Sequence, residues 1–411
     1  MSARTVEIMA PVGSFESLRA AFLGGADAVY FGIEQLNMRA RSSINFTTED
    51  LVEVVELCHE NGVKAFLTLN TILYDHDINL MKKIVKIAAN SNVDAIIAMD
   101  QAAISYAHSL GMSVHISTQI NITNIEVVKF YANFANVMVL SRELTLQQVK
   151  SICDAVKKED VRGPNGKLVQ IEVFVHGALC MAVSGKCYLS LHTANSSANR
   201  GACKQNCRRT YEVKDSEGNE LLIDNEYIMS PKDLCTVTFL DQIIETGVSV
   251  LKIEGRSKGP DYVKEVTACY REAADAVAEG TFTLEKGKEW ETRMDNVFNR
   301  GFWGGYFLGQ ELGEWTDEDG SKAKKRKVFV ADGGKFYGKI NVAEFNMRNG
   351  DLSVGDDIII TGPTTGLIEH KIDSLVLDDK QVETVKRGDN FTFPISDKVR
   401  PSDRIYKIVD A

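Results

Sequence analysis

Short runs of apolar and β-branched residues recur along the first part of the chain, and each run is followed by a stretch with helical periodicity. The stretch 48–61 is typical, since its apolar positions repeat with a period near 3.6 residues. Several helical stretches end in a glycine turn directly before the next run, as in NGVKAF and TGVSVLKI. We interpret eight runs as strands, at 7–11, 28–32, 64–70, 94–100, 113–119, 137–141, 170–176 and 249–255.

This alternation of strands and helices predicts a parallel sheet, and eight strands favour a TIM-like (β/α)₈ barrel. The pattern alone leaves an open doubly wound sheet as an alternative. We assign residues 1–280 to the barrel and residues 177–248 to an insertion after the seventh strand, since that segment is too long for a simple crossover. Residues 281–320 read as a helical and aromatic connector. Residues 321–411, rich in short strands and turns, predict a small C-terminal β-barrel.

Composition places the chain among ordinary globular proteins, with 25% charged and 44% hydrophobic residues. No apolar run approaches the ~18 residues of a membrane span, so we expect no membrane association and a cytoplasmic location. The formal net charge of −10 argues against a surface covered by nucleic acid, although it allows a local basic patch.

Five of the eight cysteines, Cys180, Cys187, Cys203, Cys207 and Cys235, fall in the predicted insertion. The other three lie in helical patterns with apolar neighbours and are expected to be packing thiols. Cysteines of a cytoplasmic protein are normally reduced, so a cluster of them indicates metal or redox chemistry. Four thiolates suit structural zinc or an iron–sulfur cluster, and the spacing does not decide between the two.

Polar residues follow several of the predicted strands. In an α/β barrel the carboxyl ends of the strands share one face, and that face carries the chemistry. We therefore expect one site that contains Gln119, Asn121, Arg142, Lys252 and Arg256.

The segment 172–190, EVFVHGALCMAVSGKCYLS, resembles the signature of the collagenase-like peptidase family, whose members are peptidases of unknown catalytic type. Glu, Phe, Gly, Cys, Gly, Cys and Ser occur at the spacings of that pattern. The resemblance continues through 199–209, 229–234 and 252–256, and it covers roughly residues 5–310.

Despite its name, this family includes oxygen-independent hydroxylases that act on tRNA, ribosomal RNA or ubiquinone. The resemblance implies a 4Fe–4S cluster on Cys180, Cys187, Cys203 and Cys207, with Cys235 as an alternative fourth ligand. It also implies prephenate as the hydroxyl donor. The Cys203-x₃-Cys207 pair followed by Arg208 and Arg209 resembles the tRNA branch, so we expect both arginines to contact RNA and the product to be 5-hydroxyuridine at the wobble position.

Further roles follow from residue type and place. His176, Glu172 and Lys252 are candidate catalytic residues, and Arg142 and Arg256, with Gln119 and Asn121, are candidate ligands for prephenate because guanidinium matches carboxylate geometry. A purely structural interpretation stays open, in which His176 satisfies a hydrogen bond and the cations pair with Glu143 and Glu254.

Two other functions stay open as well. One is a peptidase, although no HExxH or GxSxG motif occurs. The other is an accessory protein of ubiquinone hydroxylation. A partner protein or a second copy of the chain is compatible with the sequence in each case.

Overall fold

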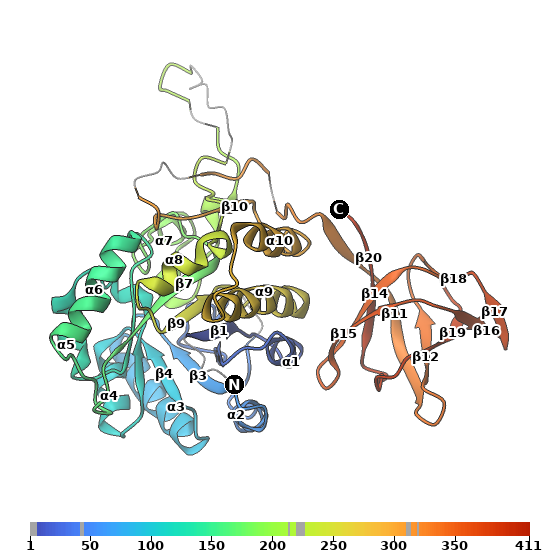
Figure 1. The fold of residues 1–411 in the computed structure, drawn as a ribbon, viewed down its shortest axis with the longest axis horizontal. Coiled ribbons are helices and arrows are strands. Elements are labelled where there is room, and N and C mark those ends of the chain that lie inside the picture. The colour runs from blue at the N-terminus through green and yellow to red at the C-terminus, as the bar shows by residue number, and fades with distance from the viewer. Residues whose placement is uncertain (1–5, 42–44, 213, 219–226, 310–313, 319) are drawn as a thin grey trace.

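The computed structural model describes residues 6–41, 45–212, 214–218, 227–309, 314–318 and 320–411. Its first part is a closed barrel of eight parallel strands (Figure 1). The strands are β1 (Glu7–Pro11), β2 (Ala28–Phe31), β3 (Lys64–Leu69), β4 (Ala95–Ala98), β5 (Val114–Ile116), β6 (Val137–Val139), β7 (Gln170–Ala178) and β9 (Val250–Ile253). Strand β9 pairs in parallel with both β1 and β7, which closes the sheet. The predicted barrel is therefore confirmed, and the open sheet is excluded.

Helices surround the barrel on its outside (Figure 1). They are α1 (Phe15–Leu23), α2 (Leu51–Glu60), α3 (Ile78–Asn90), α4 (Gln101–Ser109), α5 (Ile125–Ala132), α6 (Leu146–Lys158), α8 (Leu240–Glu245) and α9 (Pro260–Ala278), and α10 (Leu284–Met294) packs on α9. Local sequence sets their beginnings: the Ser14 side chain accepts a hydrogen bond from the Ser17 amide, and Thr145 and Gln148 form a capping box before α6.

The strands are buried on both faces. The outward-facing residues join the helices in one large apolar core, while Met9, Tyr30, Phe66, Ile97 and Val250 are among the residues that fill the barrel interior. Side chains alternate between the two faces along each strand, so Ile8 and Ala10 face the helices and Met9 faces inward. This double burial explains why the strands appear in the sequence as almost continuous apolar runs.

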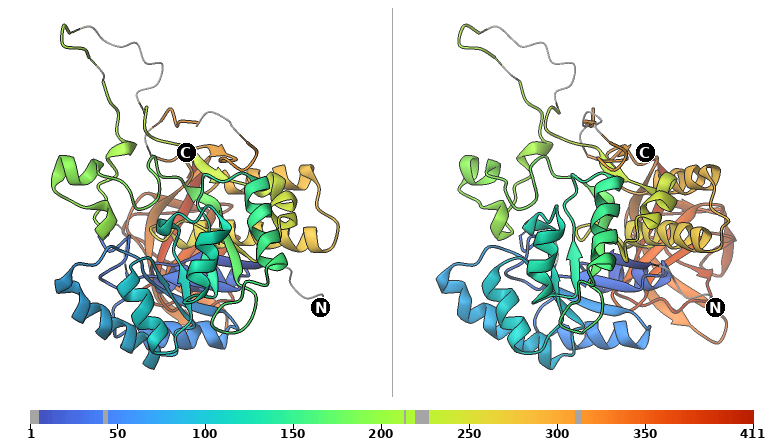
Figure 2. Two further views of the ribbon diagram at one scale, coloured as in Figure 1. Left: turned by 90° about the vertical axis from the view of Figure 1, so that its left-hand side faces the viewer. Right: turned by 60° about the vertical axis from the view of Figure 1, so that its left-hand side comes forward.

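The insertion between β7 and β9 holds α7 (Leu189–Ala194), three short 3₁₀ turns that include η3 (Ala198–Arg200) and η4 (Asn206–Arg208), and the strand β8 (Asp233–Cys235). Strand β8 runs antiparallel to the end of β7, with Cys235 opposite His176, and also pairs with β10 (Phe302–Trp303). Figure 2 shows the loops around α7 projecting from one end of the barrel.

Arg200 ties this insertion to the loop after β3. Its guanidinium donates to the Asp77 carboxylate at 2.7 Å and to the Ile72 carbonyl at 3.0 Å. It also lies 4.1 Å from the centre of the Tyr74 ring. These contacts hold the segment that contains Cys203 over the barrel.

The C-terminal domain, predicted as a small β-barrel, consists of antiparallel strands. Its main sheet has the order β15–β14–β20–β11–β12–β19–β16–β17, and β13 pairs with β18 beside it. The strands are β11 (Lys325–Tyr337), β12 (Val342–Met347), β13 (Asp351–Ser353), β14 (Asp357–Gly362), β15 (Gly366–Lys371), β16 (Leu375–Leu377), β17 (Lys380–Val382), β18 (Thr384–Lys386), β19 (Asn390–Pro394) and β20 (Arg404–Asp410). The domain has its own apolar core, which includes Phe345, Phe391 and Phe393.

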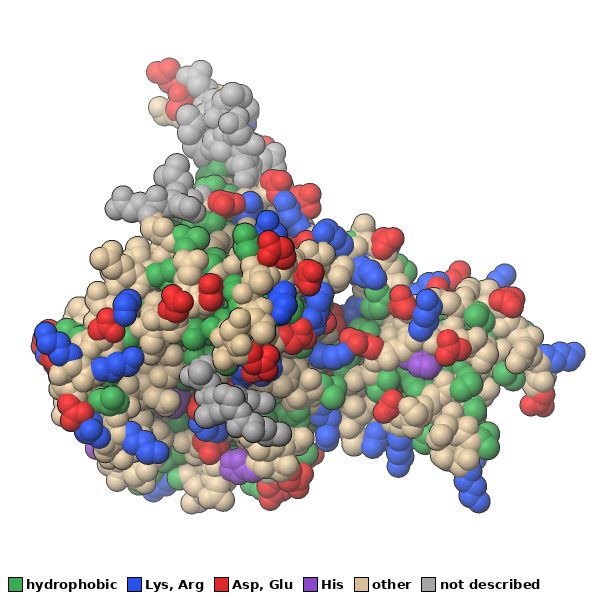
Figure 3. All heavy atoms as spheres, viewed as in Figure 1, with side chains coloured by type: hydrophobic (Ala, Val, Ile, Leu, Met, Phe, Trp, Pro, Cys, Tyr) green, Lys and Arg blue, Asp and Glu red, His purple; other side chains and the backbone are tan. Residues whose placement is uncertain are grey.

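The C-terminal domain contacts the barrel mainly at α1. Arg19 of α1 donates to the Pro363 carbonyl at 3.0 Å, and Lys264 of α9 pairs with Glu369 at 2.5 Å. Figure 3 shows basic and acidic side chains intermixed along this junction. Within the described residues, no helix combines the length and apolar character that a membrane crossing requires.

The Arg200 contacts generate a prediction about local stability. Arg200→Ala should increase opening of residues 196–208, because a partly buried charged hydrogen bond contributes about 1–2 kcal/mol, which corresponds to roughly 5- to 30-fold faster amide exchange there. Hydrogen exchange read by mass spectrometry measures this. Arg162→Ala, which removes the exposed ion pair with Asp160, is the matched control. Equal exchange of residues 196–208 in both variants would contradict the anchoring role of Arg200.

Candidate active site

A pocket lies over the carboxyl ends of the barrel strands and under the cysteine-bearing insertion. Residues from the barrel strands and residues from the insertion both line it. The strand ends supply Tyr30, Thr68, Asn70, Ile97, Ser117, Thr118, Gln119, Arg142, Phe174, Lys252, Glu254 and Arg256, and the insertion supplies the segments around Cys180, Cys187, Cys203 and Cys207. Barrel closure therefore brings the strand ends and the cysteines into one site.

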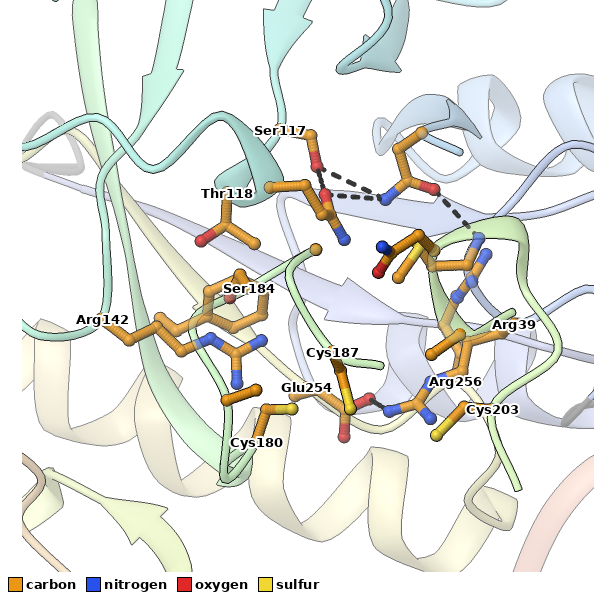
Figure 4. A pocket seen from close by; sticks show the side chains of 18 of the residues that line it. Arg39, Ser117, Thr118, Arg142, Cys180, Ser184, Cys187, Cys203, Glu254 and Arg256 are labelled. Carbon is orange, nitrogen blue, oxygen red and sulfur yellow. Dashed lines mark hydrogen bonds and ion pairs between the residues drawn. The ribbon is translucent and has the colours of Figure 1, made fainter. Parts of the chain in front are cut away.

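The four cysteines of the insertion all line this pocket, and all are free thiols. Figure 4 shows the side chains of Cys180, Cys187 and Cys203 directed toward the same part of the pocket, beside Glu254. Burial raises the pKa of the Cys207 thiol, and the neighbouring thiols of Cys180, Cys203 and Cys187 raise it further. The thiols are thus close enough to influence one another electrostatically.

Four of the candidate metal donors that line the pocket are thiols. No three His, Cys, Asp or Glu side chains of the described residues lie close enough together to hold a single metal ion. Four thiols form a soft-ligand set, which fits zinc or iron–sulfur chemistry by ligand type.

An ion pair between Arg39 and Glu254 crosses the pocket, with 2.7 Å between the guanidinium and the carboxylate. Burial by itself raises the pKa of Glu254, but the charge of Arg39 and its hydrogen bond outweigh this and hold that pKa at about 2. Glu254 is therefore ionised at neutral pH. The pair fixes one carboxylate next to the cysteines.

A second ion pair joins Lys252, which lines the pocket, to Glu172, which is not among the lining residues. Lys252 lies 2.6 Å from the Glu172 carboxylate, and both side chains are buried. The other carboxylate oxygen of Glu172 is buried without a hydrogen-bond partner among the described residues. Burial lowers the pKa of Lys252, which Glu172 partly offsets. The Lys252 ammonium also lies 4.6 Å from the centre of the Tyr30 ring.

Two further cations, Arg142 and Arg256, line the pocket, and we call them, together with Arg39 and Lys252, the cationic wall. Arg256 donates to Thr68 at 2.7 Å and to Asn37 at 3.0 Å, and burial lowers its pKa to about 10. Arg142 donates to the Ala178 carbonyl at 2.9 Å and stacks 4.1 Å from the Phe174 ring. The Nε atom of Arg142 is buried and has no hydrogen-bond partner in the described part of the chain. Neither arginine forms an ion pair with Glu143 or Glu254 among these residues, which was the structural alternative left open by the sequence.

Gln119 and Asn121 have different surroundings. Gln119 lines the pocket and accepts hydrogen bonds from Ser117 and Asn70. Asn121 adopts a left-handed backbone conformation with φ 59° and donates to the Ser184 carbonyl at 3.0 Å. Asn121 therefore holds the loop between Cys180 and Cys187 onto the end of β5, outside the pocket lining.

Some predicted site residues lie outside the pocket. His176 packs among the rings of Tyr262, Tyr270 and Phe302, and burial lowers its pKa to about 3. Cys235 lies beside it in β8, where burial raises the thiol pKa to about 12. His176 is thus neutral at physiological pH, and Cys235 is separated from the four cysteines of the pocket.

The two arginines after Cys207 also differ. Arg208 donates to the carbonyls of Leu179 and Pro231, both at 2.5 Å, and to the Ser230 hydroxyl at 3.0 Å. Its guanidinium therefore crosslinks the insertion. Arg209 is exposed and available to a partner.

Two further residues of the site, Arg39 and Asn70, were not expected from the sequence. Arg39 follows β2 and Asn70 follows β3, so both occupy strand-end loops, and this position was the signal available for finding them. With Arg39 included, the cations Arg39, Arg142, Lys252 and Arg256 outnumber the carboxylates Glu172 and Glu254. The pocket is therefore suited to an anion.

Comparisons with known proteins agree on one family. The profile of peptidase family U32 matches residues 13–317. A protein named collagenase from Porphyromonas gingivalis is 53% identical over 99% of both chains. The tRNA hydroxylation protein P1 of Bacillus subtilis is 29% identical over 98% of this chain and 94% of its own. A 23S rRNA 5-hydroxycytidine synthase of Escherichia coli is 34% identical over 73% of this chain and 45% of its own. The chain thus belongs to peptidase family U32.

Proposed function

We propose that the protein is an oxygen-independent RNA hydroxylase that forms 5-hydroxyuridine at the wobble position of tRNA. In this proposal Cys180, Cys187, Cys203 and Cys207 hold a 4Fe–4S cluster, and prephenate supplies the hydroxyl group. The observation that carries it is the single pocket in which four free thiols meet an excess of buried cations.

The ligand chemistry supports a cluster on these four residues. They are sulfur donors on the segments around Gly185 and Gly201, whose φ values of 72° and 80° let the chain turn sharply beside the thiols. The cationic wall would offset the negative charge of a thiolate-bound cluster. When bound, such a cluster supplies one-electron redox chemistry. Cys235 is the weaker candidate for fourth ligand, since it lies outside the pocket.

The same wall supports a dicarboxylate as the second occupant. The buried Nε of Arg142 is a donor without a protein partner, and a carboxylate oxygen would satisfy it. Lys252, which also lines the pocket, adds a positive charge in surroundings of low polarity. Gln119 adds an amide to the pocket lining. These groups would bind and orient prephenate next to the cysteines.

The reaction balances as an exchange of hydrogen and hydroxyl. The C5–H of uridine becomes C5–OH while the C–OH of the donor becomes C–H, so no further oxidant is required. Lys252 lines the pocket and pairs with the buried Glu172, which keeps one carboxylate oxygen unpaired, so this pair is the candidate for holding a proton beside the site. His176 is less suited to this role, since it packs among the rings of Tyr262, Tyr270 and Phe302 outside the pocket.

Two relatives support RNA as the substrate, since their names describe hydroxylation of tRNA and of ribosomal RNA. The tRNA relative matches this chain over nearly its whole length, whereas the chain spans 45% of the ribosomal RNA relative. We therefore favour tRNA.

Peptide hydrolysis is the second candidate, because the 53% identical relative is named collagenase. The pocket gives it little support. Hydrolysis by a serine or cysteine needs a base within hydrogen-bond reach of the nucleophile, and no histidine is among the residues that line this pocket. Burial also raises the pKa values of Cys187 and Cys207, which keeps these thiols protonated in the absence of a metal.

The first test is nucleoside analysis by mass spectrometry of tRNA from a strain that lacks the gene. We expect 5-hydroxyuridine and its derivatives to disappear and to return when the wild-type gene is supplied. Normal levels in the deletion strain, together with cleavage of gelatin or collagen by the purified protein, would favour the peptidase.

The second test concerns the cluster. Anaerobically purified protein should contain about four iron and four sulfide per chain and absorb near 400 nm. Ala replacement of Cys180, Cys187, Cys203 or Cys207 should remove most of this iron, whereas Cys235→Ala should retain it. Cys153→Ala, which also removes a buried thiol, is the control for general destabilisation. Iron loss in Cys235→Ala but not in Cys207→Ala would reassign the fourth ligand.

The third test concerns Arg142. Arg142→Lys keeps the positive charge but removes the Nε donor and the planar fork, so we expect about 10- to 100-fold less 5-hydroxyuridine at unchanged iron content. Quantitative nucleoside analysis of a complemented deletion strain measures this loss. Arg162→Lys, on a surface hairpin, should match the wild type. Full activity of Arg142→Lys would exclude a bidentate contact with the donor.

A further inference from the structure

The charge of the cysteine-bearing insertion differs from that of the rest of the chain. The protein has 47 Lys and Arg against 57 Asp and Glu. Residues 177–211 contain no Asp or Glu at all, but they contain Lys186, Arg200, Lys204, Arg208 and Arg209. A segment that has basic but no acidic residues can attract a polyanion locally, even on a protein whose net charge is negative.

Three of these cations face outward. Arg200 pairs with Asp77, and Arg208 donates to carbonyl groups inside the protein. Lys186, Lys204 and Arg209 are exposed, and none of their side chains forms an ion pair with a described residue. They are therefore free to meet the phosphates of a ligand.

The same three cations lie within two residues of cysteines that line the pocket. Lys186 directly precedes Cys187, Lys204 directly follows Cys203, and Arg209 comes two residues after Cys207. Each cysteine lines the pocket while its cationic neighbour is exposed. Because adjacent Cα atoms are about 3.8 Å apart, the backbone of each cation lies close to the pocket lining while its side chain is exposed. We call Lys186, Tyr188, Lys204 and Arg209 the rim.

Tyr188 gives the rim an aromatic face. Its side chain is 68% exposed, although it directly follows Cys187. Met181 and Val183 on the preceding loop are also exposed, at 44% and 47%. An exposed ring among cations is the combination by which proteins hold single-stranded nucleic acid, since bases stack on the ring while phosphates meet the charges. An acidic protein partner would use the cations but would not require the ring.

We propose that the rim binds a single-stranded segment of RNA, with a base stacked on Tyr188 and phosphates on Lys186, Lys204 and Arg209. This inference rests on the proposed function and assigns the surface through which its substrate reaches the pocket. The loops that hold the cysteines would then bind the RNA as well, so the base next to the stacked one would lie over the pocket.

Binding of a fluorescein-labelled RNA hairpin with a uridine-containing loop tests this inference, with the anaerobically purified full-length protein. Tyr188→Ala should weaken binding about tenfold, and Tyr188→Phe should restore it, because stacking needs the ring and not the hydroxyl. The triple variant Lys186→Ala, Lys204→Ala, Arg209→Ala should lower the slope of log affinity against log salt by about 2, since each single-strand phosphate contact contributes about 0.7. Pairing the loop with a complementary strand should abolish the difference between the variants and the wild type.

The matched control is Lys83→Ala, Lys86→Ala, Lys158→Ala, which removes the same charge from exposed positions on α3 and α6. Iron content measured in every variant separates loss of the cluster from loss of RNA contact. If rim and control variants bind the hairpin equally, the inference is overturned, while a loss of 5-hydroxyuridine in the deletion strain still supports the proposed function. A wild type without affinity for the hairpin overturns the inference, and normal 5-hydroxyuridine in the deletion strain overturns the proposed function with it.

Discussion

Closure of the barrel by β9, which pairs with β1 on one side and β7 on the other, is the constraint on which the site depends. In a closed parallel sheet every strand ends on the same face. Residues as distant in sequence as Arg39, Arg142 and Arg256 therefore line one pocket. The insertion leaves β7 at that face, and β8 then pairs back on β7 before the chain enters β9. The cysteines are thus placed over the strand ends by the connection itself.

The electrostatics of the pocket follow from this geometry. Each of the two carboxylates already has a cationic partner, Glu254 with Arg39 and Glu172 with Lys252. Arg142 and Arg256 have only neutral hydrogen-bond partners among the described residues, and both are charged groups removed from water. Such groups are costly unless a further anion compensates them. An anionic group bound in the pocket would meet this requirement.

The fold was predictable because its signals are local. Apolar runs, helical periodicity and glycine turns indicate strands and helices directly, and eight repeats indicate the barrel. The collection of strand-end residues in one pocket followed from the same topology. The partners of those residues were not predictable in this way. Lys252 pairs with Glu172 across two adjacent barrel strands, and Glu254 pairs with Arg39 from the loop after β2, so both pairs depend on distances in space.

The orientation of individual side chains could not be predicted from the sequence either. Arg208 and Arg209 are adjacent and chemically identical, yet Arg208 crosslinks three backbone segments and Arg209 is exposed. Cys235 and Cys207 are both cysteines of one insertion, yet β8 carries Cys235 behind the barrel face, against Tyr270. In each case the position of the backbone decides whether the guanidinium or the thiol is buried inside the protein or lies at the surface or in the pocket. The chemistry of this family member is therefore determined as much by the path of the insertion as by the residues it contains.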